Sequence, residues 1–440
     1  MEIKSREFIQ KLFLATKLLD RNFSCFIGDK IGISRALKYF GPGTYFHKSI
    51  NFFDNKRIGD IKNKGNFYVS LDEEGGYQLR DELELKKFLD VRTSLENVKN
   101  VDIIFNWGNF DNNVCKRIYS KFKKKFIISG SPRVDLWKSK IVKKIYSEEI
   151  KEIDKIYNKK FNLIISSNIS SFGNVKRIFS IAYKNYTFKD KKEKKEAFNN
   201  IYQELNDFKK FSKLIIQVIK TNPDDFFIIR PHPAEEYSTW KNLIKKSRLN
   251  NVILNDQFDP TPWIYRSECI IQSKSSLAIE ASILKKKIIS IDLNNQRRIF
   301  PNKFGINLKN KINIKKFLSS KKYSNKNILN KRKLFFRILN SNQKYSSVKL
   351  ISEKIDQLYK NDIKLSFLKV LFFSILFKIY DFFKSYFKID RKIHKIMNKK
   401  LSGGISKKEI FKYIKILDKN SKFMVMQVAK NTFYIKKLKL

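Results

Sequence analysis

The chain has 440 residues, of which 42% are hydrophobic and 14% aromatic, and this composition excludes a disordered protein and allows two or three domains. The formal net charge of +51 indicates anionic partners such as nucleotides or membranes, although an AT-rich base composition, which favours Lys, Asn, Ile and Phe, is its main expected source. The separate cysteines Cys25, Cys115 and Cys269 form no CxxC pair, which argues against disulfides and zinc and fits a reducing compartment.

The N-terminal residues 1–19 predict an amphipathic helix, because they contain an early acid and lack a signal-peptide cleavage site. No apolar run reaches the length of a membrane span, so we expect a cytoplasmic protein. The nearest candidate is the aromatic stretch 365–387. Four charged residues interrupt it: Lys369, Lys378, Asp381 and Lys384. Two interpretations stay open: a helix lying on the anionic inner-membrane surface, and a helix packed against the body of the protein.

Short apolar runs in the first third predict strands of a parallel α/β sheet, because polar or glycine-bearing residues and then helical patterns follow them. The runs are 25–27 (CFI), 66–71 (NFYVSL), 101–107 (VDIIFNW) and 125–129 (KFIIS). A charged helical stretch at 138–162 marks a boundary between lobes. We therefore predict a first lobe at residues 1–145.

A second series of strand-like runs, again separated by helical patterns, predicts a second α/β lobe at residues 146–335. The runs are 162–166 (NLIIS), 226–230 (FFIIR), 251–254 (NVIL), 269–272 (CIIQ) and 287–291 (KIISI). Residues 336–440 form a basic, aromatic tail that we predict to be helical. Ligands of such sheets bind outside the carboxyl ends of the strands, so polar residues at those ends are the candidates for a site.

The acidic segment Asp72-Glu73-Glu74-Gly75-Gly76 directly follows one predicted strand. Neighbouring carboxylates raise one another's pKa, which suits a general base, and the glycines allow a ligand to approach closely. We therefore take Asp72, Glu73 and Glu74 as catalytic candidates and Gly75 as part of the acceptor side. The alternative is an acidic surface turn.

Two segments in the second lobe are candidates for binding a nucleotide. Arg230-Pro231-His232-Pro233 places a histidine and an arginine at a strand end, where they suit a phosphate, unless His232 is only structural. The serines of the other segment precede a predicted helix, whose free amides attract anions. They are Ser273, Ser275 and Ser276. One turn later, Glu280 suits ribose hydroxyls; simple capping and a solvent-facing Glu280 are the alternative.

Weaker polar sets follow two other predicted strands. Arg133 and Asp135 are expected to face the cleft, and Ser167 and Asn168 add small polar groups to the nucleotide side. These sets converge if the two sheets face each other. The sequence has no P-loop, no GxGxxG after the first strand, no metal-ligand cluster and no nucleic-acid-binding motif, so we expect no metal, no other cofactor and no specific nucleic acid partner.

Six short motifs follow one another between about residues 20 and 300. They are Gly…Lys-Ser at 41–49, DEEG at 72–75, hydrophobic-x-Trp-Gly at 105–108, Gly-x-Pro-Arg-x-Asp at 130–135, RPHP at 230–233 and Ser-Ser-x-x-x-Glu-Ala at 275–281. In this order they resemble the bacterial surface carbohydrate biosynthesis proteins. Ser131 departs from the Asn expected in the fourth motif, and Lys274 is unusual before the sixth.

The resemblance implies an α/β protein of the GT-B glycosyltransferase type, with two Rossmann-like lobes whose parallel sheets face a cleft and a basic helical C-terminal region. It implies an enzyme that transfers a sugar from a nucleotide-sugar, with a cytidine nucleotide as the candidate, to a glycan or lipid-linked acceptor. Glu73 or Glu74 would be the base, and His232, Ser275 and Ser276 would hold the phosphate. A CDP-glycerol type polyol-phosphate transferase, a nucleotide-sugar epimerase and a non-catalytic polyanion-binding protein are the alternatives.

Overall fold

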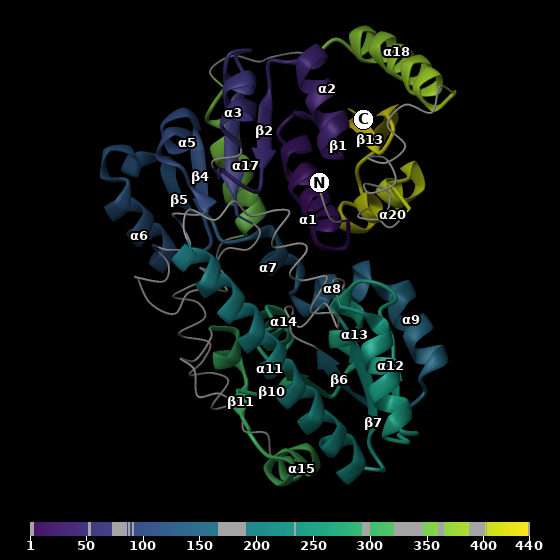
Figure 1. Ribbon diagram of the computed structural model, residues 1–440. Coiled ribbons are helices and arrows are strands. Elements are labelled where there is room, and N and C mark those ends of the chain that lie inside the picture. The colour runs from purple at the N-terminus through teal and green to yellow at the C-terminus, as the bar shows by residue number, and fades with distance from the viewer. Residues whose placement is uncertain are drawn as a thin grey trace. The chain divides into compact units, whose positions relative to one another are not determined.

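The computed structural model describes residues 4–51, 54–72, 86, 89, 92–165, 191–232, 235–292, 300–320, 346–359, 365–386, 401 and 403–438. The chain divides into two compact units (Figure 1). Unit 1 comprises residues 1–76, 81–136 and 334–440, and unit 2 comprises residues 77–80 and 137–333. The predicted tail, residues 336–440, thus lies in the same unit as the N-terminal segments.

Unit 1 contains a four-stranded parallel sheet in the order β2-β3-β4-β5. Its strands are β2 (Thr44–His47), β3 (Phe67–Leu71), β4 (Ile103–Asn106) and β5 (Phe126–Ile128). The connecting helices are α3 (Asn55–Lys62), α5 (Leu95–Asn100), α6 (Asn109–Ile118) and η2 (Ser120–Lys125), with α7 (Pro132–Leu136) after the last strand. The strands are parallel because each connection returns the chain to the amino end of the sheet. Sequence reasoning missed β2, whose four residues alternate between half-buried and buried.

A second, antiparallel sheet in unit 1 joins the two ends of the chain. The strand β1 (Ser24–Gly28) pairs with β13 (Thr432–Lys437), which forms a hairpin with β12 (Phe423–Ala429). The strand expected at residues 25–27 therefore exists, but its expected place in the parallel sheet is wrong. The prediction of a helical tail at 336–440 is likewise wrong for residues 423–437, which form this hairpin. A stack of Phe26 on Phe40, with ring centroids 4.9 Å apart, packs α2 (Lys30–Phe40) onto this sheet.

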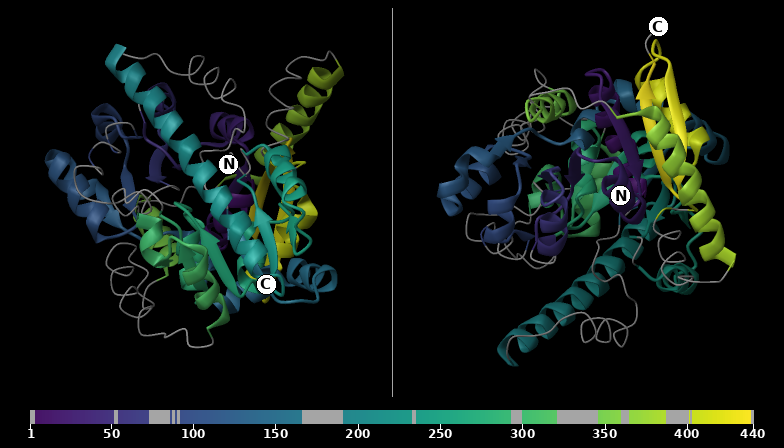
Figure 2. Two further views of the ribbon diagram at one scale, coloured as in Figure 1. Left: turned by 60° about the horizontal axis from the view of Figure 1, so that its bottom comes forward. Right: turned by 90° about the horizontal axis from the view of Figure 1, so that it is seen from above.

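The remaining helices of unit 1 lie at the ends of the chain. They are α1 (Lys4–Leu19), α17 (Ser347–Asp356), α18 (Phe367–Tyr386) and α20 (Lys407–Leu417). A capping box between Ser406 and Glu409 starts α20, and Lys4 of α1 donates to the Glu409 carboxylate at 2.6 Å. Figure 2 shows α18 beside the yellow hairpin β12–β13. None of the helices in the described part of the chain is long and apolar enough to cross a membrane.

Unit 2 contains a six-stranded parallel sheet in the order β11-β10-β9-β6-β7-β8. Its strands are β6 (Phe161–Ile165), β7 (Phe226–Arg230), β8 (Val252–Leu254), β9 (Cys269–Gln272), β10 (Lys287–Ser290) and β11 (Ile306–Asn307). The central strands are fully buried runs rich in isoleucine, as expected for a parallel sheet covered on both faces. The helices and turns are α8 (Ser139–Ile145), α9 (Ser147–Ile156), α11 (Lys191–Thr221), α12 (Tyr237–Lys246), α13 (Pro260–Arg266), α14 (Leu277–Ile283), η3 (Phe300–Phe304) and α15 (Lys311–Ser319).

The order of strands in unit 2 reverses next to β6. The chain adds β7 and β8 on one side of β6, and then β9, β10 and β11 on the other side. Such a reversal separates the loops that follow two adjacent strands and leaves a crevice at their carboxyl ends, which is where open α/β sheets bind ligands. The prediction of an α/β protein with two parallel sheets is confirmed, and the prediction that the sheets face a common cleft stays a prediction.

The pairing of β1 with β13 leaves no room for a side chain at Gly28. A Cβ atom there would lie 2.8 Å from the Asn431 carbonyl oxygen and collide with the Thr432 hydroxyl. We expect Gly28→Ala to lower the free energy of unfolding by about 2 kcal/mol, because backbone atoms must move. The measurement is chemical denaturation of purified protein.

Gly59, in the interior of α3, is the matched control, because a Cβ atom there meets nothing within 4 Å. Gly59→Ala should raise the free energy of unfolding by roughly 0.5–1 kcal/mol, since alanine favours a helix. Equal stability of the Gly28→Ala and wild-type proteins would contradict the close pairing of the first and last strands.

Candidate functional site

Residues of the predicted motifs or next to them lie at or directly after the carboxyl ends of all four parallel strands of unit 1. His47 ends β2, Asp72 follows β3, Trp107 follows β4, and Ser129 and Gly130 follow β5. Because the strands are parallel, these residues gather at one edge of the sheet. This edge is the candidate acceptor side of the site.

Asp72 is bound by an arginine that sequence reasoning did not single out. Arg92 donates to both carboxylate oxygens of Asp72, at 2.6 Å from Nε and 2.7 Å from Nη2. The indole Nε1 of Trp107 donates to the Asp72 carbonyl oxygen at 2.7 Å. A bidentate pair of this kind fixes the position and charge of a carboxylate. Asp72 is thus held in place where the acidic segment begins, and Glu73, Glu74 and Gly75 lie outside the described residues.

The loop after β4 is fixed by a buried carboxylate. The backbone amides of Trp107 and Gly108 donate to the two oxygens of Asp111, each at 2.9 Å. Burial raises the pKa of Asp111 to about 7, against the opposing effect of these amide hydrogen bonds. Asp111 therefore positions the Trp107 side chain, whose indole reaches Asp72.

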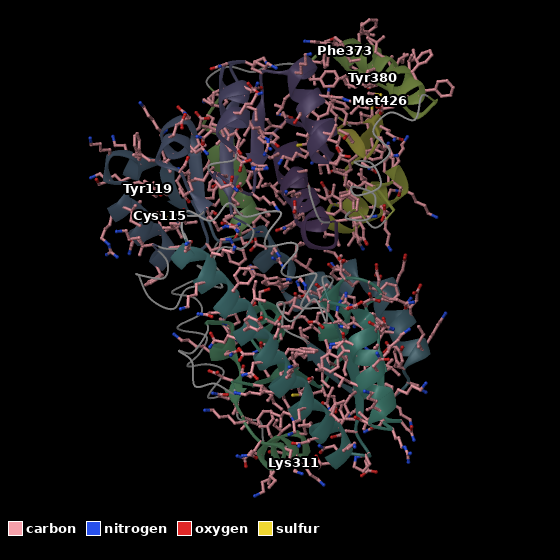
Figure 3. All side chains as sticks on the ribbon, viewed as in Figure 1. Cys115, Tyr119, Lys311, Phe373, Tyr380 and Met426 are labelled. Atoms are coloured by element: carbon pink, nitrogen blue, oxygen red, sulfur yellow. The ribbon has the colours of Figure 1, made fainter. Side chains whose placement is uncertain are left out.

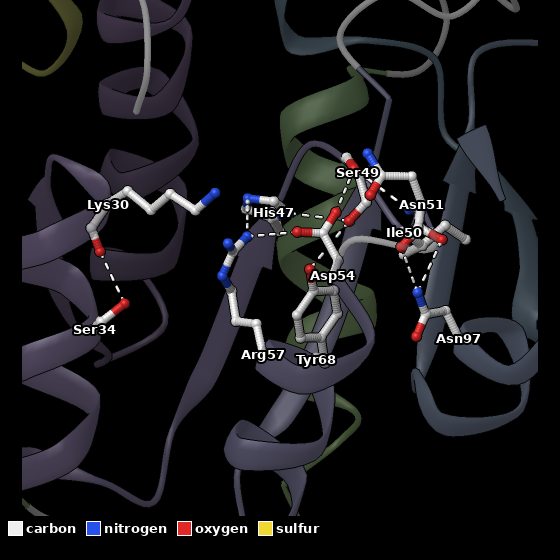
Figure 4. A network of polar contacts seen from close by, with 10 residues as sticks. All are labelled: Lys30, Ser34, His47, Ser49, Ile50, Asn51, Asp54, Arg57, Tyr68 and Asn97. Atoms are coloured by element: carbon white, nitrogen blue, oxygen red, sulfur yellow. Dashed lines mark hydrogen bonds and ion pairs between the residues drawn. The ribbon is translucent and has the colours of Figure 1, made fainter. Parts of the chain in front are cut away.

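A polar network surrounds His47 at the end of β2 (Figure 4). The Nδ1 atom of His47 lies 3.0 Å from the Ser49 carbonyl oxygen, and because a carbonyl only accepts, Nδ1 carries the proton. Nε2 is then the acceptor for Arg57 at 3.3 Å. Burial lowers the pKa of His47 from 6.5 to about 4, so the ring is neutral near pH 7.

Asp54 completes this network from the start of α3. Its carboxylate accepts from the Ser49 hydroxyl at 2.5 Å and from Arg57 at 2.6 Å, and the Tyr68 hydroxyl donates to the Ser49 carbonyl at 3.0 Å. The resemblance covered residues 41–49 but assigned His47 no role. The sequence did offer a signal for His47, because it is one of only three histidines and directly follows the aromatic pair Tyr45-Phe46.

A cavity of about 1570 Å³ lies in unit 1 beside this network. Six of its lining residues are lysines: Lys11, Lys30, Lys48, Lys369, Lys436 and Lys437. His47 and Glu7 also line it. Burial by itself would raise the pKa of Glu7, but Lys11 and Lys48 outweigh it and lower the pKa to about 2. The cavity thus combines lysines, a neutral imidazole and three carboxylates that are paired with basic side chains: Glu7 with Lys11, Asp20 with Lys437 and Asp356 with Arg21.

In unit 2, His232 and the serine segment lie on opposite sides of β6. His232 is half-buried after β7, and Ser273, Ser275 and Ser276 follow β9. Both β7 and β9 are hydrogen-bonded to β6, so these segments flank its carboxyl end. Sequence reasoning correctly identified both strand ends. Ser167 and Asn168, which follow β6 in the sequence, lie outside the described residues.

The amides of the serine segment are largely occupied by side chains of the same unit. Gln272 accepts from the Ser275 amide at 2.8 Å and donates to the Ser290 hydroxyl at 2.7 Å. Asn302 accepts from the Lys274 amide at 2.9 Å. The expectation that the backbone amides at this helix start are free to bind an anion is therefore wrong for Lys274 and Ser275. Their hydrogen bonds fix the loop instead.

Arg230 and Glu280, two further candidates, have their side chains engaged or enclosed within unit 2. Arg230 donates to the carbonyl oxygens of Gln257 and Phe258, at 2.9 and 2.6 Å, so its guanidinium braces that loop. Burial lowers the pKa of Arg230, while Asp259 acts in the opposite direction. Glu280 is only 1% exposed in α14, so the alternative of a solvent-facing Glu280 is wrong.

Asp135 does not have the environment expected of a residue that faces a substrate. Its carboxylate is buried and accepts from the Val348 amide at 3.1 Å and the Ser346 hydroxyl at 3.0 Å. It therefore caps the start of α17, where an acid also interacts favourably with the helix dipole. Arg133 is half-buried in α7.

No metal site is evident within the described ranges, where no group of three or more His, Cys, Asp or Glu side chains is suited to holding an ion. The cysteines Cys25, Cys115 and Cys269 are free and buried. Burial raises the pKa of each thiol to about 12, which argues against a cysteine nucleophile.

The buried His47 predicts a specific pH dependence of stability. The folded protein keeps this ring neutral down to pH about 4, whereas an unfolded histidine binds a proton near pH 6.5. As the pH falls from 6.5 to 4, the unfolded state alone gains the proton, so His47 should lower the free energy of unfolding by up to about 3 kcal/mol. Denaturation of wild-type and His47→Gln proteins across this range measures the difference, in which other groups cancel.

Ring NMR of the histidines provides an independent check, because the chain has only three. One ring should stay neutral with its proton on Nδ1 at pH 5. A pKa near 6.5 for the ring that is lost in His47→Gln would contradict the buried network.

Comparisons with known proteins give distant likenesses. No protein-family model matches the chain, and no curated protein matches it. Among solved structures, the wall teichoic acid polymerase TagF (H548A) is similar with 14% identity and a TM-score of 0.41, covering 67% of this chain and 70% of that one. UDP-GlcNAc 2-epimerase from Methanocaldococcus jannaschii is similar with 14% identity and a TM-score of 0.47, covering 74% of this chain and 80% of that one. UDP-GlcNAc 2-epimerase from Neisseria meningitidis, bound to UDP-GlcNAc, is similar with 13% identity and a TM-score of 0.45, covering 80% of this chain and 83% of that one.

Proposed function

We propose that this chain is a glycosyltransferase-like enzyme of surface polysaccharide biosynthesis, which transfers a sugar from a nucleotide-sugar to a glycan or lipid-linked acceptor. The observation that carries the proposal is the position of the six motifs. Five of them begin at or shortly after the carboxyl end of a parallel strand, namely β3, β4, β5, β7 and β9, and the first, at 41–49, spans β2 and the residues that follow its carboxyl end. Ligands of α/β sheets bind at these ends, so motifs placed there support a binding role.

The donor nucleotide is assigned to unit 2. His232 and Ser275 flank the carboxyl end of β6, beside the reversal of strand order that leaves a crevice in such sheets. His232 is the proposed contact to the leaving phosphate, because a histidine beside a developing negative charge stabilises it. Arg230 supports this loop from behind by holding the carbonyl groups of Gln257 and Phe258.

The acceptor is assigned to unit 1, with a carboxylate that takes the proton from its hydroxyl. Arg92 already neutralises Asp72, which makes Asp72 a poor base and a good anchor for the segment that follows. Glu73 or Glu74 is therefore the proposed base. The lysine-rich cavity next to His47 supports an anionic acceptor, such as a phosphate-bearing one.

Nucleotide binding to the intact protein tests the donor assignment. We expect CMP or CDP, at about a hundredfold excess over Kd, to raise the Tm by roughly 5 °C, because a ligand that binds only the folded state stabilises it. His232→Ala should abolish this shift. The control is Lys246→Ala, which also removes a positive charge. Lys246 is exposed at the last residue of α12, shortly before the start of β8, and so lies away from the carboxyl ends of the strands.

Equal shifts with CMP, CDP, UMP, UDP and GDP that persist in His232→Ala and vanish in salt would overturn the proposal in favour of a polyanion-binding protein. Radiolabelled donor then separates the enzyme classes. Nucleotide released only with acceptor, and lost in Glu74→Gln or Glu73→Gln, supports a transferase. Conversion of the free nucleotide-sugar without release of nucleotide would instead identify an epimerase.

A further inference from the structure

The helix α18 has one face that packs on unit 1. Val370 and Phe377 are buried against α2 and the hairpin, with the Phe377 ring 5.2 Å from that of Tyr39. Asp381 fixes the orientation of the helix, because it accepts from Arg35 at 2.7 Å and from the Lys430 amide at 3.2 Å. Figure 3 labels three side chains at this contact, Phe373, Tyr380 and Met426.

The opposite face of α18 is also apolar, and it is exposed. Its exposed fractions are Leu368 75%, Phe372 59%, Ile375 51%, Ile379 47%, Phe382 65% and Phe383 54%. The first four positions are three or four residues apart, and Phe382 and Phe383 lie three and four residues after Ile379, so all six form one continuous stripe along the helix. Ten of the sixteen exposed large hydrophobic residues recorded in the described chain belong to this helix. A contiguous apolar patch of this kind marks a surface that meets another apolar phase.

The charges around the stripe identify its partner. At about 100° per residue, Lys369 and Lys378 fall on opposite sides of the exposed stripe, at its margins. Lysines in these positions keep their ammonium groups at the level of lipid headgroups while the apolar side chains enter the bilayer. A second copy of the chain is disfavoured, because two molecules of net charge +51 repel each other.

We propose that α18 docks the protein on the surface of an anionic lipid bilayer. The helix lies in the plane of the membrane, with Phe372 and Ile379 on the inserted face, Lys369 and Lys378 at the headgroups, and Val370 and Phe377 holding it to the protein. This inference rests on the exposure and charge of one helix and is independent of the proposed enzymatic function.

Sedimentation of the full-length protein with vesicles tests the proposal. The vesicles contain phosphatidylcholine with about one-third phosphatidylglycerol, or phosphatidylcholine alone. Phe372→Asp with Ile379→Asp should weaken binding to the anionic vesicles at least tenfold, because charged groups are costly to insert. The control is Leu95→Asp with Ile312→Asp, which alters two apolar residues elsewhere that are at least as exposed, and it should leave binding within about twofold.

The lysines give a second, distinct readout. Lys369→Gln and Lys378→Gln should each weaken binding to anionic vesicles about fivefold and leave binding to pure phosphatidylcholine unchanged. Wild-type binding to anionic vesicles that the aspartate pair does not weaken would overturn the proposal, as would the absence of binding.

Two other occupants of the stripe are distinguished without lipid. If a second copy covers it, the wild-type protein is a dimer by analytical ultracentrifugation and the aspartate pair is a monomer. If the chain itself covers it, the aspartate pair lowers the Tm as much as Phe377→Ala, a truncation in the packed face. Either result would overturn bilayer docking, whereas a monomeric wild type and a nearly unchanged Tm of the aspartate pair support it.

Discussion

Parallel strand pairing is the constraint on which both candidate sites depend. Because every strand of each parallel sheet runs in the same direction, the loops after the strands emerge at one edge and bring distant residues such as His47, Asp72 and Trp107 to it. The opposite edges carry structural contacts. Asp102 accepts from Lys62 and the Tyr68 amide, each at 2.7 Å, and Asn251 donates to three backbone carbonyls. The chemistry of a polar residue therefore depends on the end of the strand at which it lies.

Much of this arrangement could be predicted from the sequence, because buried parallel strands are short apolar runs with abrupt polar ends. The strands β3 to β10 were recognised in this way. The four-residue β2 was missed because it contains Thr44 and His47, and β11 because it has only two residues. The pairing of β1 with β13 joins residues about 400 positions apart, and no local pattern encodes a contact at that distance.

The roles of individual polar residues were harder to predict than the strands. A polar side chain at a strand end can face a ligand or can satisfy backbone groups of its own fold, and the sequence is the same in both cases. Asp135 caps α17 and Arg230 holds two loop carbonyls, although both were expected to meet a substrate. Arg92 shows the converse, since nothing in its local sequence indicates that it binds Asp72.

The excess of positive charge limits what binding by itself can show. The chain has 93 basic and 42 acidic residues, so cations remain in excess even if every acid is paired. Any nucleotide or acidic lipid is therefore attracted at low salt, whether or not a specific site exists. Selective binding of one ligand therefore has to come from the arrangement of side chains around a site, and the cavity of unit 1 offers one such arrangement. This cavity is lined by His47 at the end of β2 and by Lys369 at the margin of the docking stripe on α18. An acceptor carried by a lipid would thus meet the proposed acceptor side and the helix proposed to dock on the membrane within the same unit.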